Sequence, residues 1–303
     1  MENEKFPEGK MAICIQEKKL LLPPFLMYPL YNRYSMGWRM GSGEGYVMKF
    51  RKWFRQFSEE EQELYIKLFP APISIPDYWN ESFDVNGNCP EEYTHKKLFA
   101  YRWEITGCTK YTMTWFRKTL QTEPQIRFRL FENALPYGRR MPDVLSAWSP
   151  CCFVPLCFPE EEAFYSASAF ILYAKALFSG KQSLINRVRR NNGNAEVLSA
   201  LAFEMNSHPD KEWDRIFPGM LALAQYFKFS QNRDLREFLL STDNDILLCL
   251  DSKDLLLGCR IILNEITGKQ EILGENLLGF AIMNARDEIR KIYGNIHLCE
   301  NFE

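Results

Sequence analysis

The sequence predicts an α+β fold that is mainly helical, and three observations support this. A long apolar helical face runs through residues 160–178, and an amphipathic helical pattern closes the chain at residues 275–292. Between them, residues 245–250 and 255–262 form two short apolar runs typical of buried strands, separated by a charged turn. With 303 residues, of which 46% are hydrophobic, the chain can fill a sizeable core.

The N-terminal part is expected to contain two helices and a hairpin. Apolar residues recur at helical spacing through residues 46–54, after a glycine-rich loop. Ser58 and Glu61 then form a capping-box pattern, which predicts a second helix through Phe69. Residues 101–115 are aromatic and β-branched, which is typical of a hairpin.

The C-terminal half is expected to be mostly helical. Four amphipathic segments follow the long apolar helix, at residues 182–190, 195–206, 211–227 and 233–240. A strand-like alternation at residues 125–130 lies upstream, within a stretch whose prolines and glycine favour a break near residue 135. We therefore interpret residues 1–135 as an N-terminal region and residues 136–303 as a second domain.

Composition and charge argue against several classes of function. A net charge of −2 with 25% charged residues gives no overall field that would attract nucleic acid or an anionic membrane. The first residues lack the order of a secretory signal, and prolines interrupt the apolar residues 20–31, so no membrane span is predicted. Nine cysteines without a CxxC pair predict reduced thiols and a cytoplasmic location.

No metal or cofactor is predicted. The densest cysteine cluster is Cys151, Cys152 and Cys157. Adjacent cysteines do not readily place both sulfurs on one tetrahedral metal, and the three histidines are not spaced with them as ligands. We expect these cysteines to be buried structural thiols.

Two motifs in the last third of the chain carry a family resemblance. Residues 228–242 read KFSQNRDLREFLLST, and residues 274–286 read GENLLGFAIMNAR. Both strings, at this separation, resemble segments of the NADAR family. Weaker matches lie at residues 146–150 (SAWSP) and 173–178 (YAKALF), and residues 31–44 resemble a segment that precedes the domain in longer members. The resemblance implies a mostly helical α+β domain.

The resemblance also implies a chemistry, the hydrolysis of the N-glycosidic bond between ribose C1′ and a base. Its substrates would be riboflavin precursors or ADP-ribosylated nucleobases. Such a bond breaks through a state with positive charge on the sugar, which a neighbouring carboxylate stabilises. In the family this carboxylate lies two helical turns before a lysine, which corresponds here to Lys175.

The position that corresponds to the catalytic carboxylate is occupied by Ser168. Seven residues separate Ser168 from Lys175, so the two share a helix face, about 10.5 Å apart. A serine cannot stabilise a cation through full charge or act as a base without a partner. Glu162, with its two acidic neighbours, either replaces the missing acid from an earlier turn or only complements the helix dipole.

Three further departures from the family pattern affect the expected site. Ala202 and Phe203 stand where a Gly-Arg pair is usual, which removes a cation suited to phosphate. Cys249 replaces a strand acid, and Leu257 replaces a tryptophan, although Asp254 is kept. We therefore expect weak binding of ADP-ribose.

The kept residues allow two interpretations each. Lys175 either contacts a ligand phosphate or is the solvated edge of its helix. Trp148 either stacks on a base or packs in a turn, and Asn276 is either a ligand donor or a helix cap. We expect Ser168, Lys175, Asp254 and Asn276 to share one cleft. The arginines at residues 187–190 are interpreted as a solvated face, so direct binding of nucleic acid is not expected.

Two hypotheses of function follow. In the first, the pocket binds a nucleotide-like molecule, either ADP-ribose or a ribosylated base, and hydrolysis is weak or lost. In the second, the chain is a non-catalytic protein that binds a protein partner, and Phe203 and Leu257 fill the pocket. An active glycosidase that uses Glu162 is the remaining alternative.

Overall fold

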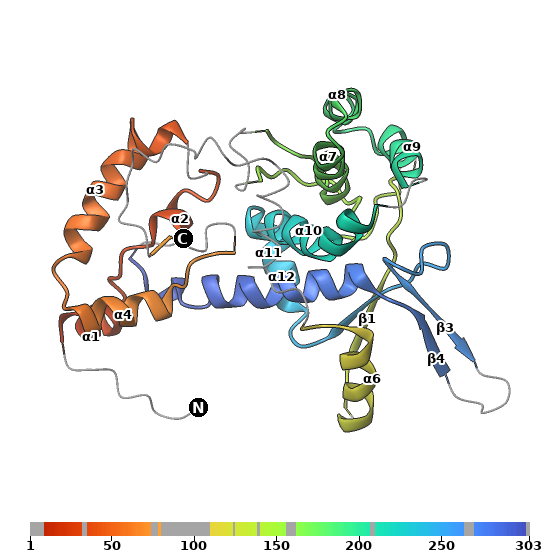
Figure 1. Ribbon diagram of the computed structural model, residues 1–303. Helices are drawn as coiled ribbons and strands as arrows, with labels where there is room; N and C mark the ends of the chain where they lie inside the picture. Colours follow the sequence, from red (N-terminus) through yellow and green to blue (C-terminus); the bar gives the residue numbers. More distant parts are fainter. Residues whose placement is uncertain are drawn as a thin grey trace. The chain divides into compact units, whose positions relative to one another are not determined.

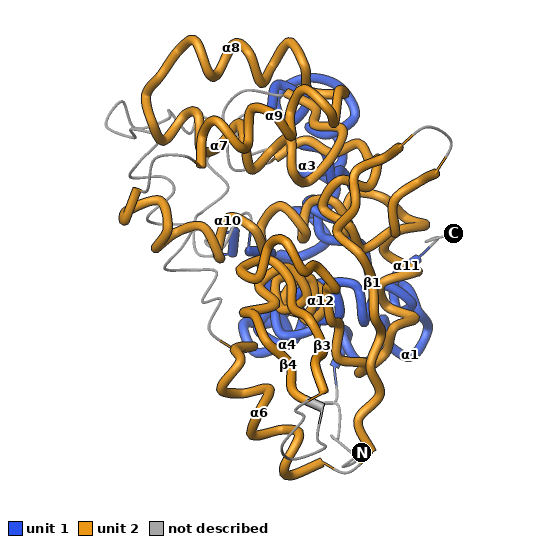
Figure 2. The backbone as a smooth tube through the Cα atoms, turned by 90° about the vertical axis from the view of Figure 1, so that its right-hand side faces the viewer, with its two compact units in different colours: residues 1–90, 156–161, 288–303 blue, residues 91–155, 162–287 orange. Residues whose placement is uncertain are grey.

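The computed structural model describes residues 9–31, 35–73, 78–79, 110–123, 125–137, 140–155, 162–206, 210–263 and 270–300. They form an α+β fold that is mainly helical, as predicted (Figure 1). The chain divides into two compact units (Figure 2). Unit 1 comprises Met1–Pro90, Leu156–Glu161 and Glu288–Glu303, and unit 2 comprises Glu91–Pro155 and Glu162–Asp287. None of the described helices is both long and apolar enough to cross a membrane.

Unit 1 is built from short helices: α1 Lys10–Gln16, α2 Pro24–Met27, α3 Ser42–Phe54 and α4 Glu59–Leu68, with the 3-10 helices η1 Met36–Trp38 and η2 Ile296–Leu298. The predicted capping box of α4 is confirmed. The Ser58 hydroxyl accepts from Glu61 N, and Ser58 N donates to the Glu61 carboxylate at 3.0 Å. Tyr65 is fully buried among aromatic side chains, including Phe50.

The helices of unit 2 follow the predicted periodicity closely. They are α6 Met113–Thr122, α7 Ala167–Ser179, α8 Gln182–Arg190, α9 Ala195–Asn206, α10 Lys211–Ser230 and α11 Arg233–Ser241, and α12 Leu277–Tyr293 begins in this unit. Helix α7 packs against α8, α9 and α10. Most of the hairpin expected over residues 101–115 lies outside the described residues, and its last three residues begin α6 instead.

Helix α7 starts later than its apolar pattern predicted. Residues 162–166 are not helical, because Phe164 pairs with Phe153 through two backbone hydrogen bonds of 3.1 and 2.8 Å. Ser166 then caps the helix, since its hydroxyl accepts from Ala169 N at 3.1 Å. The expected helix over residues 160–178 was therefore wrong in its first part, which removes Glu162 from the helix.

Unit 2 contains two small sheets. Strand β1, Phe128–Phe131, pairs in parallel with β2, Ile246–Cys249, which is buried as predicted. Strand β3, Cys259–Leu263, pairs antiparallel with β4, Gln270–Gly274. The strand expected over residues 255–262 was wrong in its start and its burial, because residues 255–257 form a turn and β3 is largely exposed.

The expected boundary near residue 135 stays a prediction. Helix α6 and strand β1 lie upstream of it in the sequence, and both belong to unit 2.

The junction of β2 with α12 depends on a single buried side chain, that of Asn276. Its oxygen accepts from Cys249 N and its amide donates to Leu247 O, both at 2.9 Å. Asn276 adopts a left-handed backbone with φ of 50°. A Cβ at Gly279 would lie 2.2 Å from Leu247 O, so only glycine permits this close approach. The Gly and Asn of the closing motif therefore hold β2 to the start of α12.

Two replacements of Asn276 should separate the effect of its hydrogen bonds from the strain of its left-handed backbone. Asn276→Ala leaves two buried backbone groups of β2 unpaired and keeps the left-handed strain, so the free energy of unfolding should fall by about 3 kcal/mol. Asn276→Gly loses the same hydrogen bonds but relieves the strain, and it should be about 1 kcal/mol more stable than the alanine variant. Chemical denaturation measures both values. An alanine variant as stable as the natural chain would contradict this account.

Candidate functional site

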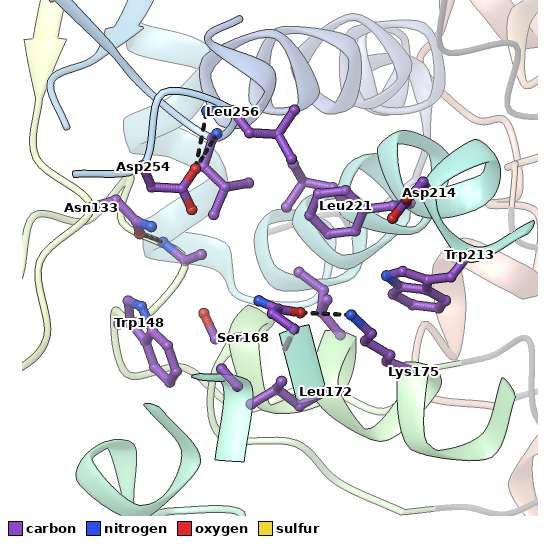
Figure 3. A pocket seen from close by; sticks show the side chains of 16 residues that line it. Asn133, Trp148, Ser168, Leu172, Lys175, Trp213, Asp214, Leu221, Asp254 and Leu256 are labelled. Carbon is purple, nitrogen blue, oxygen red and sulfur yellow. Dashed lines mark hydrogen bonds between the residues drawn. The ribbon is translucent and has the colours of Figure 1, made fainter. Parts of the chain in front are cut away.

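Unit 2 contains a pocket of about 360 Å³. Its walls come from α7, α9 and α10, from the turn at residues 254–257, and from the segments around Asn133 and Trp148 (Figure 3). This volume is in the range of small-molecule sites. Trp148, Ser168, Lys175 and Asp254 line it, so the structure brings these four predicted residues together.

Helix α7 provides one wall. Ser168 and Lys175 lie two turns apart on its pocket-facing side, with Ile171 between them. Ser168 is largely buried, and Figure 3 shows its hydroxyl directed into the pocket. Its backbone N donates to Ala147 O at 2.9 Å, which ties α7 to the wall that carries Trp148.

Buried Lys228 fixes the pocket wall that carries Trp148. Its ammonium donates to Val144 O at 2.6 Å and to Ser146 O at 2.7 Å. The Asn133 side-chain oxygen accepts from Ala147 N at 3.0 Å, which fixes the same turn from its other side. Burial lowers the pKa of Lys228 to about 8, although the fields of Cys151 and Asp143 oppose this shift. The lysine of the KFSQN motif thus positions the turn on which Trp148 sits.

Lys175 lies at the other end of the pocket. Its ammonium donates to the Asn206 side-chain oxygen at 2.6 Å and lies 5.8 Å from the ring centroid of Trp213. Burial lowers the pKa of Lys175, and the carboxylates of Asp214 and Asp210 act against that shift. Lys175 is therefore a partly desolvated cation within the pocket rather than a fully solvated helix edge.

Two carboxylates line the described part of the pocket, those of Asp254 and Asp214. One Asp254 oxygen accepts from the backbone N of Leu256 and of Leu257, both at 3.0 Å. This turn explains why the predicted strand starts late. Asp214 is exposed and lies in the first turn of α10.

Two predicted site residues lie elsewhere. Glu162 does not line the pocket and instead contacts Arg189 at 2.7 Å, because the chain before α7 is extended. Asn276 is absent from the pocket lining, and both polar atoms of its side chain bind the backbone of β2.

Phe203 does not fill the pocket. It is 83% exposed, whereas its neighbour Ala202 lines the pocket wall. The expected filling by Phe203 was therefore wrong, because the helix turn directs that side chain outward. Leu257 does line the pocket.

Five further polar or aromatic residues line the pocket and were not predicted from the sequence: Asn133, Asn206, Trp213, Asp214 and Phe217. Asn133 was assigned to the N-terminal region, since it precedes the expected break. The sequence did contain a signal for α10, because Trp213, Phe217 and Leu221 recur at intervals of four and mark the pocket-facing side of this helix.

Comparison with known proteins identifies the family of this chain. A family model described as the NADAR domain matches residues 137–290, just over half of the chain. The chain belongs to the NADAR family. The resemblance inferred from the two motifs is thus confirmed. The NADAR chain is also similar to N-glycosidase R617 of Acanthamoeba polyphaga mimivirus, with 27% identity over 148 residues, which cover 48% of this chain and 86% of the viral protein.

Buried Lys228 of this NADAR protein should make the free energy of unfolding depend on pH. Lys228→Met removes the donor to two carbonyls and should lower the free energy of unfolding by about 2 kcal/mol near neutral pH. The pKa of Lys228 is about 8 in the folded chain and higher in the unfolded chain. Between these values the unfolded chain binds a proton that the folded chain does not, so the natural chain gains stability as the pH rises.

The difference in the free energy of unfolding between the natural chain and Lys228→Met should therefore widen above about pH 8, by up to about 1.4 kcal/mol per pH unit. Urea denaturation of both chains across this range measures it, and titrations common to both chains cancel. A difference that narrows with rising pH would contradict the proposed burial of the charge.

Proposed function

We propose that the pocket of this NADAR protein binds a ribosylated nucleobase or an ADP-ribose-like ligand and cleaves its N-glycosidic bond only weakly. One observation carries the proposal. The pocket is open and lined by Trp148, Lys175 and Asp254, yet the side chain on α7 at the expected place of the acid is Ser168.

The lining suits a nucleoside-like molecule. The half-buried indole of Trp148 offers a flat apolar surface for a base, and the Lys175 ammonium can contact ligand oxygens. Asp254 and Asn133 add acceptor and donor groups at the Trp148 end. An apolar pocket with a few polar groups is the usual form of a small-molecule site.

The chemistry explains why cleavage should be weak. When the bond between C1′ and the base nitrogen breaks, its electron pair stays on the nitrogen and positive charge develops on the sugar. The base nitrogen takes up a proton from solvent, and water then adds its oxygen to C1′ and gives up a proton. A carboxylate at position 168 would stabilise that charge and accept that proton, whereas the Ser168 hydroxyl does neither without a partner.

The open pocket favours this proposal over a purely non-catalytic interaction protein. Phe203 points away from the pocket, so it does not fill the pocket as the second hypothesis required. The name of the viral relative, an N-glycosidase, also supports this class of reaction. The cysteines of the described residues are free thiols, which supports the proposal that the protein works in the reducing cytoplasm.

Restoring the acid tests the proposal. Ser168→Glu should raise the rate of base release from an ADP-ribosylated nucleobase by about a hundred- to ten-thousand-fold, because it supplies the missing charge. Ser168→Gln is the matched control, with the same size and no charge, and should stay at the rate of the natural chain. Chromatography of the released base measures the rate, and calorimetry measures binding.

Two outcomes would contradict the proposal. Robust turnover by the natural chain that Ser168→Gln does not change, and that Glu162→Gln abolishes, would indicate an active glycosidase with a displaced acid. Failure of the natural chain and of Ser168→Glu to bind any ribosylated ligand would favour the interaction protein.

A further inference from the structure

We infer that this pocket selects an N-riboside whose base carries a positive charge, and that Trp148 and Asp254 are the residues that select it. The inference rests on the proposed function and narrows its ligand class. It follows from the charges of the lining residues and from the surroundings of these two side chains.

The pocket lining carries more negative than positive charge. Among the described lining residues, Asp214 and Asp254 are acidic and Lys175 is the one cation. The Lys175 ammonium is already engaged by Asn206 at 2.6 Å and by the face of Trp213. Such a lining disfavours a pyrophosphate, which would meet two carboxylates, and favours a ligand of positive charge.

Asp254 offers a charge that is held in place. One of its oxygens accepts from the backbone N of Leu256 and of Leu257, which fixes the carboxylate within the turn. Its second oxygen has no hydrogen-bond partner within the described ranges. The residue is half-buried, so its field is screened less than that of an exposed side chain.

Trp148 offers the open aromatic face. The other indole of the pocket, Trp213, already faces the ammonium of Lys175. Among the described residues, no ring or cation contacts the indole of Trp148, which is half-buried in the lining. Figure 3 shows Trp148 and Asp254 toward one end of the pocket, and Lys175, Trp213 and Asp214 toward the other. A cationic ring on Trp148 gains a cation–π contact there.

A cationic base also suits a pocket without an acid at position 168. When its bond to C1′ breaks, the electron pair stays on the base nitrogen and the base leaves uncharged, so no proton has to be supplied to it. A water molecule adds its oxygen to C1′ and releases its proton to solvent. The charge of the ligand thus assists cleavage in a pocket whose position 168 supplies no carboxylate.

A matched pair of nucleosides tests the inference. The probe is 7-methylguanosine in mildly acidic buffer, where the methylated base is cationic, and guanosine is the neutral control. ADP-ribose is the anionic reference. The natural chain should bind 7-methylguanosine about tenfold more tightly than guanosine in calorimetric titrations, and ADP-ribose more weakly than 7-methylguanosine.

Two aspartates of one turn provide matched variants. Asp254→Asn keeps an oxygen that accepts from the two backbone N–H groups but removes the charge, so the preference should fall to about twofold. Asp251→Asn is the control, because Asp251 likewise accepts from Lys253 N at 2.9 Å and Asp254 N at 3.0 Å but does not line the pocket. It should keep the tenfold preference. Trp148→Leu is a second variant that should also lower the preference.

The outcomes separate this inference from the proposed function. Binding of guanosine as tight as that of 7-methylguanosine by the natural chain would overturn the inference and leave the proposed function intact. An equal loss of preference in Asp254→Asn and Asp251→Asn would overturn the role of Asp254. If the natural chain binds none of the three compounds, the proposed function itself is contradicted, and the inference with it.

Discussion

The pocket depends on the ammonium of Lys228, a cation with no exposed surface. It holds the carbonyls of Val144 and Ser146, and the following residue, Ala147, accepts a hydrogen bond from Ser168 N. The Trp148 wall and the α7 wall therefore depend on one buried charge. Burying a charge is costly unless it is hydrogen-bonded, so both carbonyls must stay within its reach. This requirement restricts where the turn can lie.

The motifs that carry the family resemblance mostly stabilise the fold of this chain. Lys228 holds a turn, Asn276 bridges to β2, and Gly279 allows α12 to approach the β2 backbone. Buried Arg286 donates to Thr242 and to the carbonyl of Asp245. These residues shape the pocket from outside its lining. The fold can therefore persist while the chemistry at position 168 differs.

Periodicity predicted the helices well where one face is buried. The bounds of α8 and α9 match the expected segments, and the capping box places the start of α4. The start of α7 was missed because the apolar pattern continues through Phe164, which pairs with Phe153 as extended chain. Composition alone does not distinguish an apolar extended segment from the first turn of a buried helix.

The candidate site was only partly predictable, for a similar reason. Trp148, Ser168, Lys175 and Asp254 follow from local motifs that stay local in the fold. Asn133 reaches the pocket through a tertiary hydrogen bond to Ala147, and its sequence neighbours give no sign of that contact. Glu162 pairs with Arg189 of helix α8, a partner that could not be identified from spacing.

A crystal structure of the chain grown with a saturating ribosylated nucleobase would show whether the pocket is the ligand site. The ligand is expected inside the pocket of unit 2, with its base against Trp148 and its ribose over Ser168. A ligand bound elsewhere on the chain, or a pocket that excludes it at saturation, would contradict the claim that this NADAR pocket still accepts a ribosylated base.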